Sequence, residues 1–212
     1  MDLLKKYFPQ ITEPQLDKLI LFEKLIKEWN NKINLISRKD VENFEVNHLL
    51  HSLSILKFIE FKKDTKILDL GTGGGLPGIP LSIIFPDSKF KLIDRKNKKI
   101  NVLNKIITEL GINNASAQSI DIIDSNHNYD FIVNRAVSSA DNLIKLCKGK
   151  INYKGENKIK NGIICLKGGD LNSELKNIDE FQIVELKSFF SEQFFETKKI
   201  LYIPNPYNHT DS

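Results

Sequence analysis

Two acidic residues, each at the end of an apolar segment, frame a glycine-rich loop in this chain. Asp69 lies in the segment 66–70, which leads directly into a loop that contains Gly71 and Gly73, and Asp94 ends the segment 89–94. Glycine lets a backbone turn tightly and approach a ligand closely. An acid at the end of the second strand can accept hydrogen bonds from ribose hydroxyls. This arrangement predicts a site for a nucleoside-bearing cofactor.

The spacing of the glycines distinguishes between cofactors. A dinucleotide site requires G-x-G-x-x-G, and the pattern fails from Gly71 because Leu76 takes the third glycine position. It passes from Gly73, but that match gives Asp69 no role. The alternative pattern, D-x-G-x-G-x-G from Asp69 to Gly75, is similar to the first motif of S-adenosylmethionine (AdoMet)-dependent methyltransferases. The sequence favours AdoMet, while a dinucleotide and a simple glycine-rich turn remain alternatives.

Length and composition restrict the class of protein. The chain has 212 residues, of which 41% are hydrophobic and 27% are charged, which suits one globular domain with a small extension. No segment approaches the roughly 18 apolar residues of a membrane span, and the N-terminus lacks the apolar core of a signal peptide. Two cysteines and four scattered histidines show no metal-ligand spacing. We therefore expect a cytoplasmic protein without a membrane partner or a metal site.

Lysine clusters suggest a polyanionic partner. Residues 145–167 contain seven lysines and one acid, Glu156, and residues 95–99 form a second basic cluster. We expect both clusters to lie near one ligand face and to bind RNA, with an ordinary solvated lysine surface as the alternative. The candidate RNA contacts are Arg95, Lys98, Lys99, Lys154, Lys158 and Lys167.

Hydrophobic periodicity divides the chain at about residue 62. Residues 1–62 are predicted to form a helical N-terminal extension, with one helix that begins at a Thr12–Gln15 capping box and a second over about 40–61. Residues 63–212 alternate between strands and helices, which predicts a parallel α/β sheet that ends in an antiparallel hairpin. The predicted strands are 66–70, 89–93, 115–118, 129–134, 161–166 and the hairpin segments 181–189 and 197–203; the predicted helices are 78–85, 96–110 and 139–148.

Several longer motifs point to one family. They are Trp29-Asn30-x-Lys32-x-Asn34-Leu35, His48-Leu-Leu-x-Ser52-Leu53, the Leu76-Pro77-Gly78 part of the glycine loop, Asp94-x-x-x-Lys98-Lys99, Tyr129-Asp130-x-x-x-x-Arg135-Ala136 and Leu166-Lys167-Gly168. With these motifs the chain resembles the RsmG (GidB) family of bacterial rRNA guanine-N7 methyltransferases over most of its length. The resemblance implies a Rossmann-like class I AdoMet-dependent methyltransferase fold that acts on 16S rRNA or the small ribosomal subunit. We expect a monomer.

The same resemblance assigns the cofactor contacts by position. It implies that Gly71, Gly73 and Leu76 contact AdoMet from the first loop and that Asp94 holds the ribose. It further implies that Ile120 and Asp121 flank the adenine and that Arg135 completes the site. The chain departs from the family pattern at Ile36, His51, Ser119 and the pair Ile120-Asp121, which weakens the adenine-side assignment most.

The implied reaction needs alignment more than proton transfer. Guanine N7 carries an exposed lone pair, so it can attack a methyl group without losing a proton, and we name no catalytic base. Lys167 and Arg135 are expected to position phosphate or guanine, and His48, on a largely apolar helix, is expected to pack. Two alternatives remain: a methyltransferase with a different substrate, and an RNA-binding ribosome-assembly factor that retains the fold without catalysis.

Overall fold

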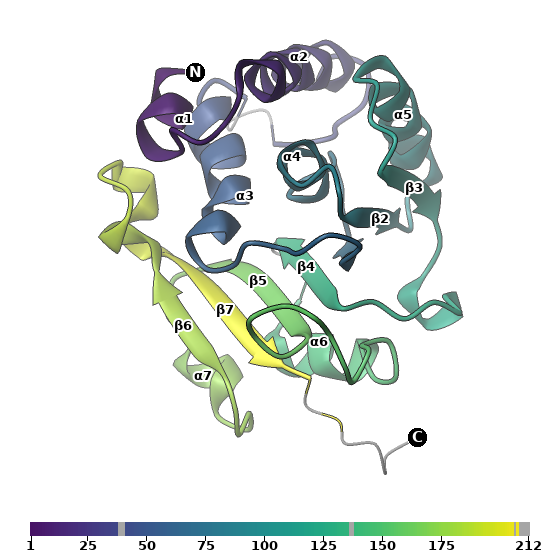
Figure 1. Cartoon of the computed structure of the whole chain (residues 1–212), viewed down its shortest axis with the longest axis vertical. Coiled ribbons are helices and arrows are strands. Elements are labelled where there is room, and N and C mark those ends of the chain that lie inside the picture. The colour runs from purple at the N-terminus through teal and green to yellow at the C-terminus, as the bar shows by residue number, and fades with distance from the viewer. Residues whose placement is uncertain (38–40, 136–137, 206, 208–212) are drawn as a thin grey trace.

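A single mixed sheet forms the centre of the molecule in the computed structural model, which describes residues 1–37, 41–135, 138–205 and 207 (Figure 1). The strand order in the described chain is β3-β2-β1-β4-β5-β7-β6. All pairs are parallel except β5–β7 and β6–β7. The strands are β1 (Lys66–Leu70), β2 (Lys89–Asp94), β3 (Ala115–Ser119), β4 (Phe131–Arg135), β5 (Gly162–Gly168), β6 (Gln182–Glu185) and β7 (Lys198–Pro204). The predicted parallel sheet with a terminal hairpin is confirmed, and β7 of that hairpin lies between β5 and β6.

Helices cover both faces of this sheet, as Figure 1 shows. One face packs against α1 (Asp2–Tyr7), α2 (Glu13–Asn30), α3 (His51–Leu53), α4 (Gly78–Ile84) and α5 (Asn97–Glu109). The other face packs against α6 (Ala140–Leu146) and α7 (Asn172–Leu175). Alternate residues of a strand point to opposite faces. Accordingly, Ile67 of β1 belongs to the first core and Leu68 belongs to the second.

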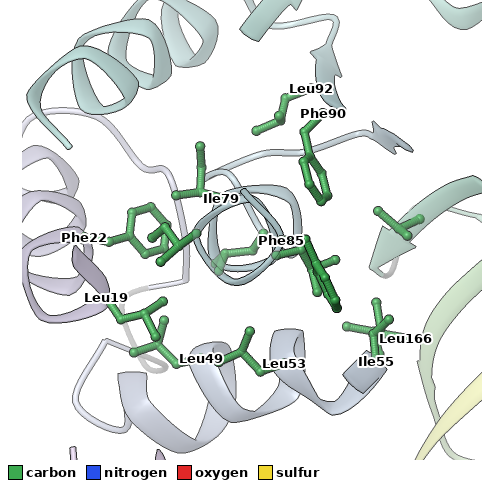
Figure 2. Close-up of a cluster of buried hydrophobic side chains, with 14 of the residues drawn as sticks. Leu19, Phe22, Leu49, Leu53, Ile55, Ile79, Phe85, Phe90, Leu92 and Leu166 are labelled. Atoms are coloured by element: carbon green, nitrogen blue, oxygen red, sulfur yellow. The ribbon is translucent and has the colours of Figure 1, made fainter. Parts of the chain in front are cut away.

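The N-terminal helices share their core with the sheet. The predicted capping box starts α2, because the Thr12 hydroxyl accepts from the backbone N–H of Gln15 while the Gln15 side chain accepts from that of Thr12. Figure 2 shows Leu19 and Phe22 of α2 beside α4, with Leu53 of α3 on another side of the same helix. Residues 1–62 therefore pack directly on the domain that carries the sheet.

The second predicted helix is wrong in its length and regularity. Asp40, where it was expected to start, lies outside the described residues. Residues 45–50 form π-helical turns, α3 follows, and residues 54–57 form a 3₁₀ turn that ends the helical segment. The chain then leaves the helix and buries Phe61, whose ring centroid lies 5.1 Å from that of Phe85 and 5.3 Å from that of Phe131. Among the described residues, no helix is long and apolar enough to cross a membrane.

Parallel strands bring the loops that follow them to one edge of the sheet. The segments after β1, β2, β3, β4 and β5 all lie at this carboxyl edge, and so does the start of the antiparallel strand β7. The loop 147–161 precedes β5 and lies at the opposite edge. There Asn157 accepts a hydrogen bond from the backbone N–H of Lys62, and Ile151 forms a bridge with Tyr129.

Candidate functional site

Asp69 holds the glycine loop in place from beneath. Its side chain is fully buried, and Oδ2 accepts from Thr72 Oγ1 at 2.6 Å and from the backbone N–H of Gly78 at 2.8 Å. Burial raises the pKa of this carboxyl to about 6. A Cβ at Gly78 would lie 2.6 Å from Asp69 Oδ2, so only glycine fits where the loop enters α4. Asp69 thus acts on the loop backbone and does not line the cleft above it.

A cleft of about 380 Å³ lies at the carboxyl edge, next to the ends of β1, β2 and β3. Four of the predicted cofactor residues line it: Gly71, Asp94, Ile120 and Asp121. Asp94 is fixed by two backbone N–H groups, from Gly73 at 3.1 Å to one carboxylate oxygen and from Lys96 at 2.8 Å to the other. Each oxygen keeps acceptor capacity, since a carboxylate oxygen has two lone pairs.

The far wall of this cleft carries the second acid. Asp121 accepts from the backbone N–H of Ile123 at 3.2 Å and forms an ion pair with Arg95 at 2.6 Å. The Arg95 side chain is 75% exposed, so the ion pair lies on the solvent side of the cleft. Arg95, predicted to bind RNA, therefore lines this first cleft.

The lining of the cleft has the chemistry that AdoMet requires. Apolar side chains of Ile93, Ile120 and Ile122 offer a flat-sided wall for a purine ring. Asp94 offers acceptors for ribose hydroxyls, and Gly71, with φ of +68°, presents backbone without a side chain. The volume falls within the range of roughly 300–1,000 Å³ typical of small-molecule sites. These residues fit the predicted cofactor.

Two other predicted contacts lie outside the lining of the first cleft. Gly73 contributes through its backbone N–H to Asp94, and Leu76 is 3% exposed and packs in the core shared with α2 and α5. Lys99, predicted to bind RNA, donates to the carbonyl of Leu35 at 3.3 Å, and burial lowers its pKa. Lys99 thereby ties the segment after α2 to the start of α5.

Arg135 lies in a second cleft, of about 540 Å³, at the ends of β4 and β5. Its Nη1 donates to the carbonyl of Asn47 at 3.2 Å and lies 2.7 Å from Nδ1 of His48. A guanidinium only donates, so Nδ1 accepts and the His48 ring carries its proton on Nε2. Burial, followed by the charge of Arg135, lowers the pKa of His48 to about 3.

An ion pair forms the opposite wall of the second cleft. Lys167 Nζ lies 2.8 Å from Oε2 of Glu174 and also donates to the carbonyl of Ser138 at 2.7 Å. The same Glu174 oxygen accepts from the backbone N–H of Ala140 at 2.8 Å. The two side chains are 10% and 18% exposed. Because Ser138 also lines the first cleft, its backbone connects the two sites.

The expectation that both lysine clusters lie near one ligand face is wrong. Lys98 is exposed at the start of α5, on the carboxyl edge, and Lys167 is the penultimate residue of β5, at the same edge. Lys154 and Lys158 lie in the loop 147–161 at the opposite edge, because that loop returns the chain from α6 to the start of β5. These lysines lie away from the clefts because β5 runs parallel to β4, so the loop before β5 is at the edge where the strands begin.

The GidB family, described as rRNA small subunit methyltransferase G, matches residues 15–200. The chain belongs to this family. Its relatives include ribosomal RNA small subunit methyltransferase G of Christiangramia forsetii, 47% identical over 98% of this chain and 98% of the relative. The protein with the same name from Bacteroides thetaiotaomicron is 44% identical over 95% of this chain and 98% of the relative.

Solved structures support the fold at low sequence identity. A mutant of MtNAS in complex with S-adenosylmethionine matches with a TM-score of 0.56 and 14% identity, over 91% of this chain and 76% of that one. A SAM-dependent methyltransferase from Aquifex aeolicus matches with a TM-score of 0.54 and 14% identity, over 79% and 98%. This GidB family member therefore has the Rossmann-like methyltransferase fold that its sequence predicted.

The sequence patterns did not identify Glu174 as a site residue or His48 as a hydrogen-bond partner of Arg135. Glu174 lies between Ser173 and Leu175 in the short helix α7 after β5, with no motif to mark it. His51, also in the second cleft, is 5% exposed, and its Nε2 has no hydrogen-bond partner among the described residues. The spacing of His48 and His51 at i and i+3 was the available signal, since it places both rings on one side of a helix.

Proposed function

We propose that this chain transfers the methyl group of AdoMet to N7 of a guanosine in 16S rRNA of the small ribosomal subunit. The observation that carries the proposal is a cleft at the carboxyl edge of the sheet, lined by Gly71, Asp94 and Asp121, in a chain that belongs to the GidB family. The names of the relatives supply the substrate class, small-subunit rRNA. We further propose that the enzyme acts as a monomer in the cytoplasm.

The first cleft binds the cofactor with a rigid acceptor and an apolar wall. Two backbone N–H groups orient the Asp94 carboxylate before any ligand arrives, so its remaining lone pairs point to fixed positions for the ribose hydroxyls. Ile93 and Ile120 flank the adenine, and Asp121, held by Arg95, lies at its polar edge. When bound, AdoMet supplies an electrophilic methyl group on a sulfonium sulfur.

The protein contributes alignment to the reaction. Guanine N7 already bears its lone pair, and in-line positioning of two reactants can supply on the order of 7–11 kcal/mol. His48 is neutral at physiological pH, but its low pKa makes it a poor proton acceptor, and its Nδ1 is occupied by Arg135. The target base has to leave the RNA stack to reach the carboxyl edge, which requires an unpaired or flipped nucleotide.

Transfer of radioactivity from AdoMet to RNA tests this function directly. The purified protein should move tritium from methyl-labelled AdoMet into 16S rRNA, supplied free and as small subunits, and not into 23S rRNA. Modified guanines should then map to one position that is lost in total rRNA from cells without the gene. RNA binding without label transfer would support the assembly-factor alternative, and label in protein or in a small molecule would support a methyltransferase with another substrate.

A further inference from the structure

We infer that the second cleft is the pocket for the target guanine and that Glu174 and Lys167 together select it over other bases. The cleft is lined by Arg135, His51, Lys167, Glu174, Phe194 and Lys198, among others. Nothing in the family match or the names of relatives assigns this pocket. The inference rests on the proposed function, because it takes guanosine N7 methylation as given and identifies how the base is recognised.

The position of the second cleft suits a substrate that reacts with a group bound in the first. Both clefts open at the carboxyl edge, the first at β1–β3 and the second at the ends of β4 and β5. Ser138 connects them, since it lines the first cleft while its carbonyl oxygen accepts from Lys167 in the second. The volume of about 540 Å³ lies within the range typical of small-molecule sites and leaves room for a flipped nucleotide.

The ion pair leaves one donor and one acceptor available side by side. The Lys167 ammonium has three N–H groups, and two of them are used by Ser138 and Glu174. Glu174 uses Oε2 for Lys167 and for the backbone N–H of Ala140, whereas Oε1 has no partner among the described residues. Neither side chain can move freely, since each is anchored to backbone. The pair therefore presents a fixed acceptor beside a fixed donor.

Guanine matches this pattern on its Watson–Crick edge. It offers the O6 acceptor next to the N1–H and N2–H donors, so O6 accepts from Lys167 while N1–H and N2–H donate to the two lone pairs of Glu174 Oε1. Adenine and cytosine place a donor where guanine has O6 and lack the N1–H type of donor beside it. They would leave the Oε1 oxygen of Glu174 without a donor when they displace water from the pocket, which is costly. With the Watson–Crick edge held, N7 remains free on the opposite side of the ring for attack.

The first test uses the unaltered protein and one base change. Single-turnover methyl transfer is measured on 16S rRNA ligated to carry guanosine or inosine at the mapped target position. Inosine keeps O6, N1–H and N7 but lacks the N2 amino group, so we expect its rate to be at least about tenfold lower. Equal rates for the two bases would overturn the inference. Absence of transfer to guanosine would instead refute the proposed function.

The second test substitutes the acceptor. Glu174→Gln keeps an oxygen for Ala140 and Lys167 but turns an amide donor toward N1–H, so guanosine methylation should fall about 10- to 100-fold. The inosine rate should fall less, so the guanosine-to-inosine ratio should approach one, while AdoMet affinity stays unchanged. The melting temperature should fall, because Lys167 loses the charge of its largely buried partner. Glu180→Gln is the matched control and should behave as the unaltered protein, because Glu180 is an exposed acid that forms a surface ion pair with Lys160. An unchanged ratio in Glu174→Gln would refute base selection by this residue, and loss of folding would leave the inosine result to decide.

Discussion

Replacing Asp94 with asparagine should weaken AdoMet binding without unfolding the protein. In the folded chain, each carboxylate oxygen of Asp94 accepts one backbone N–H, from Gly73 or Lys96, and keeps one lone pair toward the cleft. Asparagine retains a single acceptor, so one backbone N–H and one ribose hydroxyl lose their partner. Hydrogen bonds to a charged group contribute about 1.5–3 kcal/mol each. The loss corresponds to an increase of about 10- to 150-fold in the Kd for AdoMet.

Alanine at the same position removes both acceptors and both loop anchors. We therefore expect Asp94→Ala to bind AdoMet more weakly than Asp94→Asn and also to lower the melting temperature, because the loop amide of Gly73 becomes unpaired. Isothermal titration calorimetry with AdoMet gives the affinities, and thermal unfolding followed by circular dichroism gives the stability. The ranking of the two variants tests whether the carboxylate acts on both the loop and the ligand.

Asp87→Asn is the matched control for these measurements. Asp87 is an exposed acid just before β2, at the opposite end of the strand that carries Asp94. The same loss of charge there should leave the Kd for AdoMet and the melting temperature unchanged. If Asp94→Asn is folded and binds AdoMet within twofold of the unaltered protein, the first cleft does not hold the ribose and the site assignment fails. Tight binding of NAD without binding of AdoMet would refute the choice of cofactor.

Three further predictions concern pH and charge. The pKa of His48 is about 3 in the folded chain and 6.5 in the unfolded chain, so between pH 7 and 5 only the unfolded chain takes up this proton. This residue alone should therefore lower the free energy of unfolding by about 2 kcal/mol over that interval. Urea titrations of His48→Asn should show a loss of stability that is smaller by about this amount. Single-turnover methylation should be nearly flat from pH 7 to 9 in the unaltered protein and in His48→Asn, whereas a steep rise abolished by the substitution would reveal a histidine base. Lys98→Glu, on the carboxyl edge, should weaken RNA binding and reduce its salt slope by roughly one unit, while Lys158→Glu, on the opposite edge, should have a much smaller effect. Equal effects of the two lysine substitutions would mean that RNA contacts both edges.

Local patterns predicted most of the fold because they act over short distances. The Thr12–Gln15 capping box starts α2 as expected, and the apolar segments of the sheet become its strands within a few residues of their predicted limits. The segment 40–61 was harder to predict, since helical periodicity does not distinguish π, α and 3₁₀ turns. Burial of Phe61 against the sheet, a tertiary contact, sets the end of that segment.

The candidate site was predictable where its residues belong to one strand-loop-helix-strand unit. Gly71 and Asp94 could be placed together because the strand-loop-helix-strand unit brings the ends of neighbouring parallel strands side by side. Gly73 and Leu76 belong to the same loop, but Gly73 acts through its backbone N–H, and packing turns the Leu76 side chain into the core. Spacing alone does not determine which loop residues contact a ligand and which support it.

The second cleft shows why pairing between distant elements escapes a reading of one sequence. It joins the helical segment around His48, the end of β4, the end of β5 and the start of β7, and those elements meet only when β7 inserts beside β5. Glu174 becomes chemically distinctive only there, because Lys167 and the amide of Ala140 fix one of its oxygens and leave the other available. Conversely, Lys154 and Lys158 do not lie beside the ligand as predicted, because the chain returns to the opposite edge of the sheet before β5 begins. A cofactor loop is thus encoded within about thirty residues, whereas the selectivity of the substrate pocket depends on the topology of the whole sheet.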